Sequence, residues 1–404
     1  LVCGTRGRWF ESTLLYQKMT KDKKNKPSKE LPLGFVDRQE KELLVRDFII
    51  SNIKEVMIKY GFQYLETPSF EYTDSIGKFL PDKDRPDEGV FSFQDEKKWL
   101  SLRYDLTAPL ARYVAKNYLE IPKPFKRYQL GTVWRNEKPG PGRFREFLQF
   151  DADFVGTQSL QADAELCVMI SEILEKCGLG KEEYVIKISS RKITEELFKK
   201  INLDDNEQKL TALRALDKID RLGWFGVKQL LGEGRKDKSG DFTKGANLNT
   251  SNIETIETEL KKKSAESNDL LEIFKIFKDY NFNNFEFDPS IIRGLEYYTG
   301  PIFEVNLKFD VKNNKGQVIQ FGSIGGGGRY DNLVNNFGNY DAPATGISIG
   351  LDRLVYALMQ KKEFKIKQSK PVVICVFDKN SMKEYVGLQT ILRKSGISTE
   401  IYPG

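Results

Sequence analysis

The segment from Lys126 to Gly156 constrains the fold of this chain more than any other stretch. Two strand-like runs flank a turn rich in proline and glycine, Asn136 to Gly142, and this pattern predicts a β-hairpin. Side chains alternate between the two faces of a strand. One face of the second run belongs in a core and carries Leu148, Phe150, Ala152 and Phe154. The opposite face carries Phe147, Gln149, Asp151 and Asp153.

The opposite face places two carboxylates in a strand that otherwise has the composition of a buried one. Burying an unpaired carboxylate is costly, so such a face either meets solvent or lies near cationic groups. The arginines around the same hairpin are Arg135, Arg143 and Arg145. The segment alone leaves two interpretations open: a solvated acidic face, and a site that needs both signs of charge.

The composition excludes several chemistries. Histidine is absent from the 404 residues, so no Ser-His-Asp triad, histidine-ligated zinc or imidazole base can form. The four cysteines lack the spacing of a metal site or a disulfide framework, which indicates a reducing, cytoplasmic location and no protein-held metal.

With 39% hydrophobic and 30% charged residues, the chain is expected to form two or three globular domains. No apolar run approaches the roughly 20 residues of a membrane span, so no membrane partner is expected. The net charge of +6 is compatible with a nucleic-acid partner without establishing one.

The first 18 residues have little periodicity and do not begin with methionine. The peptide from Trp9 to Ser12 can be back-translated to contain GGTTCGAATC, which resembles the T-arm of a transfer-RNA gene. We therefore interpret residues 1–18 as non-native read-through of an upstream gene, with the protein starting at Met19. An ordinary disordered tail is the alternative, and the upstream DNA sequence distinguishes the two.

Apolar spacing predicts a helix over Asp37–Tyr60, followed by a strand over Phe62–Glu66. This pair belongs either to the core or to a subunit interface. A loop is expected over Phe79–Asp95, which is rich in proline, aspartate and glycine. Alternation then predicts a strand over Trp99–Thr107, with a helix over Ala108–Asn117. The polar face of that strand carries Arg103, Asp105 and Thr107.

A helix is expected over Leu160–Cys177 and a strand over Val185–Ser189. The stretch from Thr194 to about Phe285 is polar and mainly helical, which is typical of an inserted helical module. Its charges belong either to a solvated surface or to an RNA contact.

Two glycine-containing motifs follow. Asp288 to Val305 places an arginine, a Tyr-Tyr pair and two glycines close together. Gly322 to Asp331 contains four consecutive glycines, which indicates a close approach of the backbone to another group. A flexible turn has the same pattern, and the run matches neither the Walker A nor the dinucleotide motif.

The segment from Ala344 to Met359 is predicted to be a strand and then a helix, with Arg353 in the first helical turn. A cation at this position opposes the helix dipole. A phosphate bound by both the backbone amides and the arginine would remove the conflict. The alternative is an ordinary surface arginine.

The last part of the chain follows a charged linker, Lys361–Lys370. A strand over Pro371–Phe377, a helix over Ser381–Lys394 and a strand over Ser398–Tyr402 form one βαβ unit. Too little chain remains to bury both faces of its sheet, so we expect the sequence to end within this domain.

Taken together, these motifs resemble a class II aminoacyl-tRNA synthetase of the histidyl-tRNA synthetase family, from about Leu31 to the last residue. The helix and strand that end at Pro68 resemble the class II dimer motif, TVWRNE with RFREF resembles the second class motif, and GLDRL resembles the third. IIRGLEYYTG and GGGGRYDNLV resemble two peptides peculiar to the histidine enzyme. LRYDLTAPLARY and REFLQFDADFVG resemble the eukaryotic-like, alphaproteobacterial-type subgroup.

The resemblance implies an α+β fold, with a class II synthetase antiparallel sheet flanked by helices. It implies a catalytic core over residues 19–190 and 288–362, a helical insertion over 191–287, and the start of a truncated α/β anticodon-binding domain over 370–404. The implied reaction is ATP-dependent activation of L-histidine to histidyl-adenylate, followed by transfer to the 3′ end of tRNA(His). Mg²⁺ would be bound with ATP, and the enzyme would be a homodimer.

The resemblance also implies roles for the matching residues. Arg135 and Arg293 would bind the α-phosphate and the histidine carboxylate, and Glu137 would contact the adenine region and the tRNA acceptor end; these three are the expected catalytic residues. The other ATP contacts would come from Arg143, Phe147 and Arg353. The histidine ammonium group would be bound by Asp105, Thr107 and Gln149, with Leu106 in the same peptide. The imidazole would be recognised by Asp153, Tyr297 and Tyr298. Asp151 receives no ligand.

This chemistry does not need a protein histidine. A carboxylate attacks phosphorus, so two anions must be brought together, and arginines with Mg²⁺ provide the electrostatic stabilisation. An acid facing an imidazole N–H also gives specificity, because a ligand without that donor leaves a buried carboxylate unpaired.

Some positions depart from the family pattern. Asp105 and Asp153 replace glutamates found in many bacterial members, and the hairpin tip KPGPG lacks the glutamine that reads the extra 5′ nucleotide of histidine tRNA. One alternative function is the catalytically inactive paralogue that regulates ATP phosphoribosyltransferase in histidine biosynthesis. It usually lacks the anticodon domain and part of the arginine set, whereas this chain retains Arg135, Arg143, Arg293 and Arg353. Another is a synthetase-like sensor of uncharged tRNA.

Overall fold

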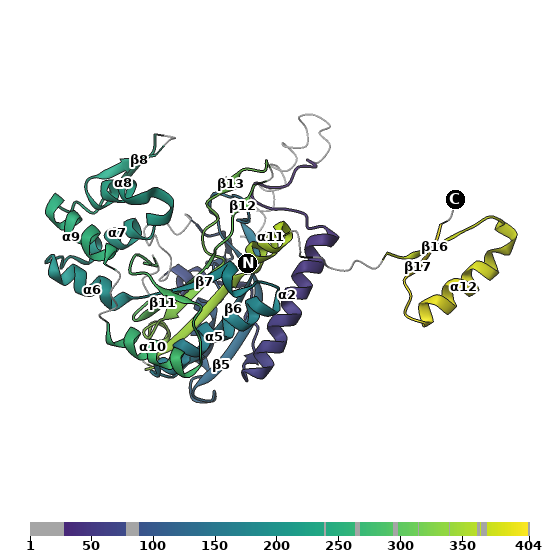
Figure 1. Cartoon of the computed structure of the whole chain (residues 1–404), viewed down its shortest axis with the longest axis horizontal. Helices are drawn as coiled ribbons and strands as arrows, with labels where there is room; N and C mark the ends of the chain where they lie inside the picture. Colours follow the sequence, from purple (N-terminus) through teal and green to yellow (C-terminus); the bar gives the residue numbers. More distant parts are fainter. Residues whose placement is uncertain are drawn as a thin grey trace, which may run out of the picture.

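The computed structural model describes residues 28–77, 89–237, 240–262, 267–293, 298–313, 315–338, 340–361, 364 and 370–402. An eight-stranded sheet with the strand order β1-β5-β6-β15-β14-β11-β7-β10 forms its centre (Figure 1). The six inner strands are antiparallel to their neighbours, whereas the edge strands β1 and β10 pair in parallel with β5 and β7. The strands are β1 (Gln63–Tyr64), β5 (Phe125–Trp134), β6 (Glu146–Val155), β7 (Tyr184–Ser190), β10 (Phe285–Phe287), β11 (Pro301–Leu307), β14 (Gly325–Arg329) and β15 (Ala344–Gly350).

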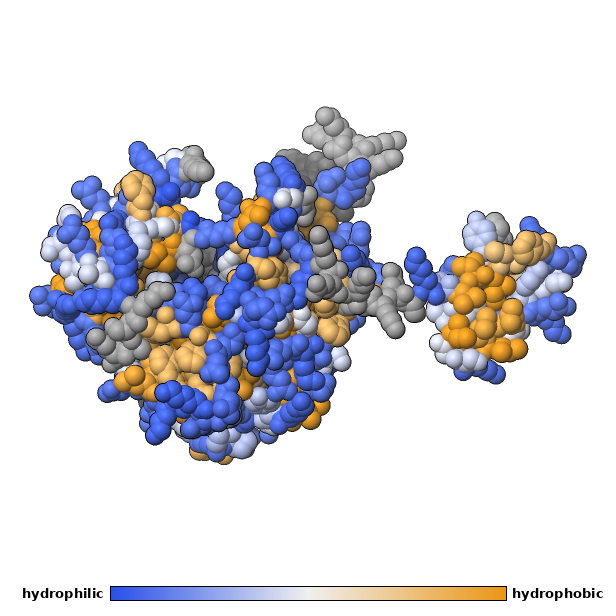
Figure 2. All heavy atoms as spheres, viewed as in Figure 1, coloured by the Kyte–Doolittle hydropathy of each residue, from blue (hydrophilic) through white to orange (hydrophobic). Residues whose placement is uncertain are grey.

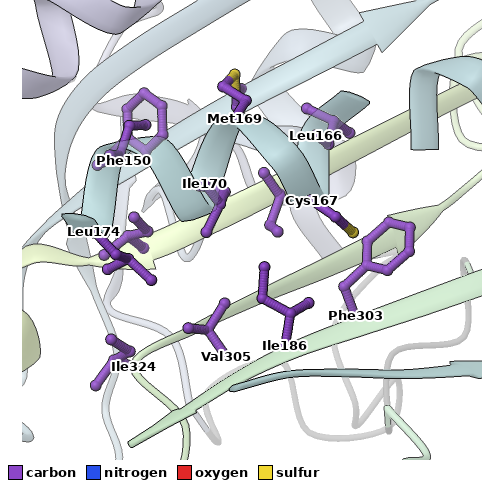
Figure 3. Close-up of a cluster of buried hydrophobic side chains, with 14 of the residues drawn as sticks. Phe150, Leu166, Cys167, Met169, Ile170, Leu174, Ile186, Phe303, Val305 and Ile324 are labelled. Carbon is purple, nitrogen blue, oxygen red and sulfur yellow. The ribbon is translucent and has the colours of Figure 1, made fainter. Parts of the chain in front are cut away.

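The fold is therefore a mixed α+β one, and the expectation of an antiparallel sheet holds for the inner strands but not for the two edges. One face of the sheet is covered by apolar helices. These are α2 (Glu40–Lys59), α5 (Leu160–Lys176), α10 (Asn268–Asp279) and α11 (Leu351–Gln360). Figure 3 shows Ile170 and Cys167 of α5 pointing toward Ile186, Val305 and Phe303 of the sheet. Cys167 and Cys177 lie in this core as free thiols.

The predicted hairpin is confirmed: β5 and β6 pair from Phe125 opposite Val155 to Trp134 opposite Glu146. The helices predicted over Asp37–Tyr60 and Leu160–Cys177 are confirmed as α2 and α5, and the strand–helix pair before Met359 as β15 and α11.

The prediction between residues 79 and 107 is partly wrong. Ser92–Asp95 is a strand, β3, rather than loop, while residues 78–88 lie outside the described part. Strand β4 (Lys98–Leu102) ends early, and helix α4 (Thr107–Lys116) starts at the residue predicted to end the strand. The Asp105 carboxylate accepts the backbone N–H groups of Thr107 and Ala108, at 3.1 and 3.0 Å. This capping contact starts a helix where alternation alone indicated a strand.

A smaller three-stranded sheet has the order β2-β4-β3, with β2 at Phe70–Tyr72 and helix α3 (Thr73–Gly77) after it. Within the stretch expected to be helical, a separate apolar cluster holds α6 to α9 together, whereas α10 packs in the main core. These elements are α6 (Arg191–Lys200), α7 (Asn206–Leu216), α8 (Ile219–Leu231) and α9 (Thr250–Lys261), with a hairpin of β8 (Gly234–Lys236) and β9 (Phe242–Lys244). The other short elements are η1 (Lys181–Glu183), β12 (Val311–Lys312), β13 (Val318–Ile319) and η2 (Val334–Asn336).

The predicted C-terminal βαβ unit is present, with parallel strands β16 and β17. It consists of β16 (Val372–Cys375), η3 (Lys379–Ser381), α12 (Met382–Lys394) and β17 (Thr399–Tyr402). Figure 2 shows an apolar surface on this unit, and its exposed apolar side chains include Val372, Val373, Phe377, Val386 and Ile391. No helix in the described ranges is long and apolar enough to cross a membrane.

Candidate active site

The polar face of β6 lies on the side of the sheet opposite the α5 core. Gln149, Asp151 and Asp153 are at most 5% exposed, so this face is not a solvated acidic surface. Residues directly opposite on neighbouring antiparallel strands share a face. On β5 these are Gly131, Gln129 and Arg127, and on β15 they are Gly350, Ser348 and Gly346.

Asp153 is neutralised by a fully buried arginine. Its carboxylate lies 3.1 Å from Arg127, which is 0% exposed and also donates to the Leu106 carbonyl at 2.8 Å. Tyr330 donates its hydroxyl to the same carboxylate. Burial raises the pKa of Asp153, and the Arg127 charge opposes that rise. A Cβ on Gly346 would overlap the carboxylate, so glycine is required for this contact.

Asp151 has different partners. It accepts from Gln149 Nε2 at 2.8 Å and from Thr107 Oγ1 at 3.4 Å. Within the described residues it makes no ion pair at 4.0 Å or less. Burial raises the pKa of Asp151 to about 7, and Asp153 pushes it in the same direction. The residue pattern of the strand did not predict that this carboxylate lies beside an amide and a hydroxyl that are themselves candidate ligands.

Arg135 lies between two aromatic rings. Its guanidinium carbon is 4.5 Å from the ring centre of Tyr104 and 5.1 Å from that of Phe147. It donates to Gln149 Oε1 at 3.4 Å and to the Tyr104 carbonyl at 3.2 Å. Tyr104 donates its hydroxyl to Glu137 at 2.5 Å. The predicted Arg135, Glu137, Phe147 and Gln149 therefore form one connected group.

Asp105, Leu106 and Thr107 enter the same site from the start of α4. Asp105 caps the helix, and burial raises its pKa while the backbone N–H of Ala108 and the Arg135 charge oppose the rise. Leu106 is buried and contributes its carbonyl to Arg127. The three residues predicted from a strand pattern thus reach the polar face from a helix terminus instead.

The glycine run forms strand β14, between β11 and β15. A Cβ on Gly326 would overlap the Arg293 guanidinium, and one on Gly328 would come within 3.0 Å of the Tyr298 ring. The run is therefore a place of close approach, as predicted, and not a flexible turn. Register places Gly326 beside Ser348 and Gly328 beside Gly346, so Arg293 and Tyr298 lie on the same face of the sheet as the polar side chains of β6, with β15 between β14 and β6. Tyr297 lies outside the described residues.

Arg143 and Arg353 meet near Gly322. A Cβ on this glycine would lie 3.8 Å from Arg143 and 3.5 Å from Arg353. Arg353 donates to the Phe321 carbonyl and lies over the Phe321 ring, 4.6 Å from its centre. Burial, together with the Arg143 charge, lowers the pKa of Arg353 to about 9. This clustering of like charges is typical of an anion-binding site.

Asp352 precedes Arg353 and fixes the start of α11. Its carboxylate accepts the Leu148 backbone N–H at 2.9 Å and lies 2.9 Å from Arg38. The N-terminus of α11, where an anionic ligand is predicted to bind, is therefore attached directly to β6 through Asp352.

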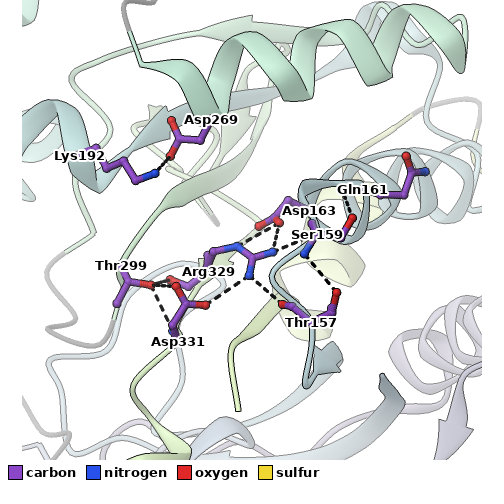
Figure 4. Close-up of polar contacts among 9 residues, drawn as sticks. All are labelled: Thr157, Ser159, Gln161, Asp163, Lys192, Asp269, Thr299, Arg329 and Asp331. Carbon is purple, nitrogen blue, oxygen red and sulfur yellow. Dashed lines mark hydrogen bonds and ion pairs between the residues drawn. The ribbon is translucent and has the colours of Figure 1, made fainter. Parts of the chain in front are cut away.

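Arg329 supports the far end of the glycine strand, as Figure 4 shows. It pairs with the buried Asp163 and with Asp331, and it donates to the carbonyls of Thr157 and Ser159 at 2.9 and 3.1 Å. Sequence reasoning missed Arg127, Arg329 and Tyr330. For Arg127 a signal existed, because the register of the predicted hairpin places it opposite Asp153.

The described residues contain no group of three or more acidic, cysteine or histidine side chains arranged to hold a metal ion. What the site offers is a row of buried carboxylates and an amide near Tyr298, with arginines around Phe147 and Phe321. It can therefore accept a ligand that is cationic at one end and anionic at the other.

A comparison with solved structures defines the class of protein. A crystal structure of histidyl-tRNA synthetase from Nostoc sp. PCC 7120 matches with a TM-score of 0.70 and 26% sequence identity, covering 94% of this chain and 87% of that one. The class is therefore that of the aminoacyl-tRNA ligases.

The sequence comparisons identify the family within that class. Residues 34–354 match the family model for histidyl-tRNA synthetase. A histidine–tRNA ligase from Bartonella quintana is 48% identical, covering 95% of this chain and 82% of its own length. One from Rhizobium meliloti is 49% identical, covering 93% and 80%. The chain belongs to the histidyl-tRNA synthetase family.

Proposed function

We propose that this chain is a histidine–tRNA ligase. It joins L-histidine to ATP to give histidyl-adenylate and pyrophosphate, and then transfers histidine to the 3′ end of tRNA(His). The observation that carries the proposal is the division of one buried polar face into a carboxylate–amide end and an arginine end. Family membership and the two relatives near 48% identity favour the ligase over the inactive regulatory paralogue.

Histidine occupies the carboxylate–amide end. Gln149, Thr107 and Asp105 bind its ammonium group, with Leu106 in the same turn, and Asp153 recognises the imidazole together with Tyr298 and Tyr297. Asp153 is suited to this role because Arg127 and Tyr330 fix its carboxylate before the ligand binds. A buried carboxylate with fixed geometry discriminates strongly against side chains that cannot donate a hydrogen bond.

ATP, as its Mg²⁺ complex, occupies the arginine end. Arg143 and Arg353 bind the outer phosphates, Arg135 and Arg293 bind the α-phosphate, and Phe147 and Glu137 contact the adenine region. The histidine carboxylate attacks the α-phosphorus in line, the bond to the bridging oxygen breaks, and pyrophosphate leaves. The arginines stabilise the negative charge on the phosphoryl and pyrophosphate oxygens, and because the histidine carboxylate is the nucleophile, the protein does not supply one.

Transfer to tRNA would use the rest of the chain. We assign residues 191–287 to a helical insertion between the two parts of the catalytic core, 19–190 and 288–362, and 370–404 to the start of an anticodon-binding domain. Within 191–287, α6 to α9 form the separate cluster, whereas α10 and β10 belong to the main core and sheet. A cytoplasmic location accords with this role and with the free cysteines.

A homodimer accounts for an exposed aromatic surface. Phe70, Tyr72 and Phe93 lie on one face of the β2-β4-β3 sheet and are 45–50% exposed, and the Phe70 and Phe93 rings meet edge to face at 5.4 Å. Contiguous apolar surface of this kind marks an interface.

Light scattering tests the proposed homodimer: the wild type is expected to have the mass of two chains, and Phe70→Ser/Phe93→Ser that of one. A wild-type monomer at micromolar concentration contradicts it.

Histidine-dependent exchange of pyrophosphate into ATP tests the ligase itself. We expect exchange with histidine and none with phenylalanine. Arg293→Ala should lower the rate by about 10²–10³-fold, the usual cost of removing one group that stabilises developing charge. A full-length protein that folds and binds ATP but gives no exchange would support the regulatory paralogue or the uncharged-tRNA sensor instead.

A further inference from the structure

We infer that Asp151 is a positioning residue that fixes the orientation of the Gln149 amide, so that the amide oxygen and not the nitrogen faces the ammonium group of histidine. The inference rests on the proposed function, because it concerns how the ammonium site of that reaction is oriented. Asp151 itself is 1% exposed and lies behind Gln149 in the same strand.

The two neighbours of the amide determine its orientation. Gln149 Nε2 donates to Asp151 Oδ1 at 2.8 Å, and Gln149 Oε1 accepts from Arg135 Nη2 at 3.4 Å. The ammonium group of the ligand favours the ionised form of Asp151, and an ionised carboxylate can only accept hydrogen bonds, whereas a guanidinium can only donate them. Rotating the amide by 180° would place its nitrogen against Arg135 and its oxygen against Asp151, and both contacts would become repulsive.

Asp151 also holds a second candidate ligand. Its other carboxylate oxygen, Oδ2, accepts from Thr107 Oγ1 at 3.4 Å. Thr107 begins α4 and Gln149 lies in β6, so one carboxylate connects the two elements that supply the ammonium ligands. Because the Thr107 hydroxyl donates its proton to Asp151, its oxygen lone pairs remain available to accept from the ammonium group.

The contrast with Asp153 supports this separation of roles. Asp153 has an arginine at 3.1 Å, whereas the short-range contacts of Asp151 are to the Gln149 amide and to the hydroxyls of Thr107 and Ser348. An ammonium group can only donate, so each group that faces it must present an acceptor. Asp151 makes Gln149 and Thr107 present acceptor oxygens to the ammonium group, and Asp151 itself does not contact the substrate.

The test uses Asp151→Asn and two imidazole ligands, one with and one without the ammonium group. L-Histidinol retains the ammonium group and the imidazole, and 3-(imidazol-4-yl)propanoate lacks the ammonium group. The new asparagine can present a donor or an acceptor, so the Gln149 amide is no longer held in one orientation. Binding of histidinol should weaken about tenfold or more, the usual effect of losing hydrogen bonds to a charged group. Binding of the propanoate should change by less than about threefold.

A double variant that exchanges the amide and the carboxylate between positions 149 and 151 should restore histidinol binding. A merely structural role of Asp151 would not predict this recovery. In Gln149→Glu/Asp151→Asn the new asparagine can donate to the new glutamate, whose other oxygen then faces the ammonium group. This variant should bind histidinol more tightly than either Asp151→Asn or Gln149→Glu alone. If Asp151→Asn does not fold, the inference is still tested by whether the double variant binds histidinol more tightly than Gln149→Glu does.

Two results would overturn the inference: equal weakening of both ligands in folded Asp151→Asn, or no gain in the double variant. A wild type without histidine-dependent exchange but with normal histidinol binding would instead count against the proposed function. The Michaelis constant for histidine should rise in Asp151→Asn while that for ATP stays unchanged, which separates a positioning effect from general loss of structure.

Discussion

Buried charge is compensated by the protein itself at one end of the polar face, and is left to be compensated by a ligand at the other. At the carboxylate–amide end, Arg127 neutralises Asp153 inside the protein, and Asp151 is satisfied by Gln149 and Thr107. At the arginine end, Arg143 and Arg353 approach each other, and no ion pair of either is found among the described residues. The first end is complete before a ligand arrives, whereas the second is completed by the ligand's own charge. Mutations at the first end should therefore affect folding as well as ligand binding, whereas mutations at the second should affect ligand binding alone.

The largest expected effect is from Arg127→Met. It leaves Asp153 buried without its counter-charge, and breaking such a pair costs about 3–5 kcal/mol of unfolding free energy. Urea unfolding measures this cost. Lys126→Met is the matched control on the same strand, because its ion pair with Glu165 is partly exposed and should contribute less than about 1 kcal/mol. Equal losses in the two variants would show that the carboxylate end is not pre-neutralised.

Gly346→Ala should have the next largest effect. The added Cβ overlaps the Asp153 carboxylate and must displace it from Arg127, with an expected cost of about 1–3 kcal/mol and a loss of histidine affinity. Thermal unfolding and exchange kinetics report the two effects separately. Gly140→Ala is the control, because no atom lies within 4 Å of the added Cβ. An unchanged Michaelis constant for histidine in Gly346→Ala would argue against Asp153 as a ligand.

Arg353→Gln tests the arginine end. We expect the Michaelis constant for ATP to rise about tenfold, as for loss of one charged hydrogen bond. The free energy of unfolding without ligand should stay the same or increase, because the substitution relieves repulsion by Arg143. A clear loss of stability without ligand would mean that this charge is compensated within the protein, and the comparison between the two ends would fail.

The pKa of about 7 at Asp151 predicts a pH dependence at the carboxylate–amide end. The pKa of Asp151 is higher in the folded protein than in the unfolded chain. Protonated Asp151 therefore contributes its full stabilisation to the ligand-free protein below pH ~4, and this contribution is lost as the pH rises through 7. The ammonium group favours the ionised form, so histidinol should bind more weakly at pH 6 than at pH 8. Calorimetry in two buffers should show proton release near pH 7, and Asp151→Asn should reduce it, leaving only the part that comes from other groups such as the ligand's imidazole. Proton release of the same size in that variant would assign the titration to another group.

The smallest effect is expected from truncation after Lys361. Neither end of the site includes the β16–α12–β17 unit, so histidine-dependent exchange should be unchanged. Charging of tRNA(His) should fall, because the proposed anticodon contact is lost. A large loss of exchange would place this unit in the support of the catalytic core.

Several features of the site were predictable because they depend on local chemistry. The period of two in β6 separates Phe150 from Gln149 and Asp151, and the Pro/Gly turn sets the hairpin. Arg353 was predicted at a helix start, and the glycine run was predicted to allow close approach. Asp105 was misplaced because its capping contact competes with strand alternation, and a pattern of residue types does not show which of the two wins.

The sequence by itself determined the hairpin, the polar face and the family, because periodicity, turn residues and short motifs are local properties. Only the tertiary structure decided how the charges on that face are compensated. Arg127, Tyr330 and Gly346 come from three different strands or loops, and their effect on Asp153 depends on sheet register. The free energy of a buried charge is set by partners within a few ångströms in space, and those partners are far apart along the chain.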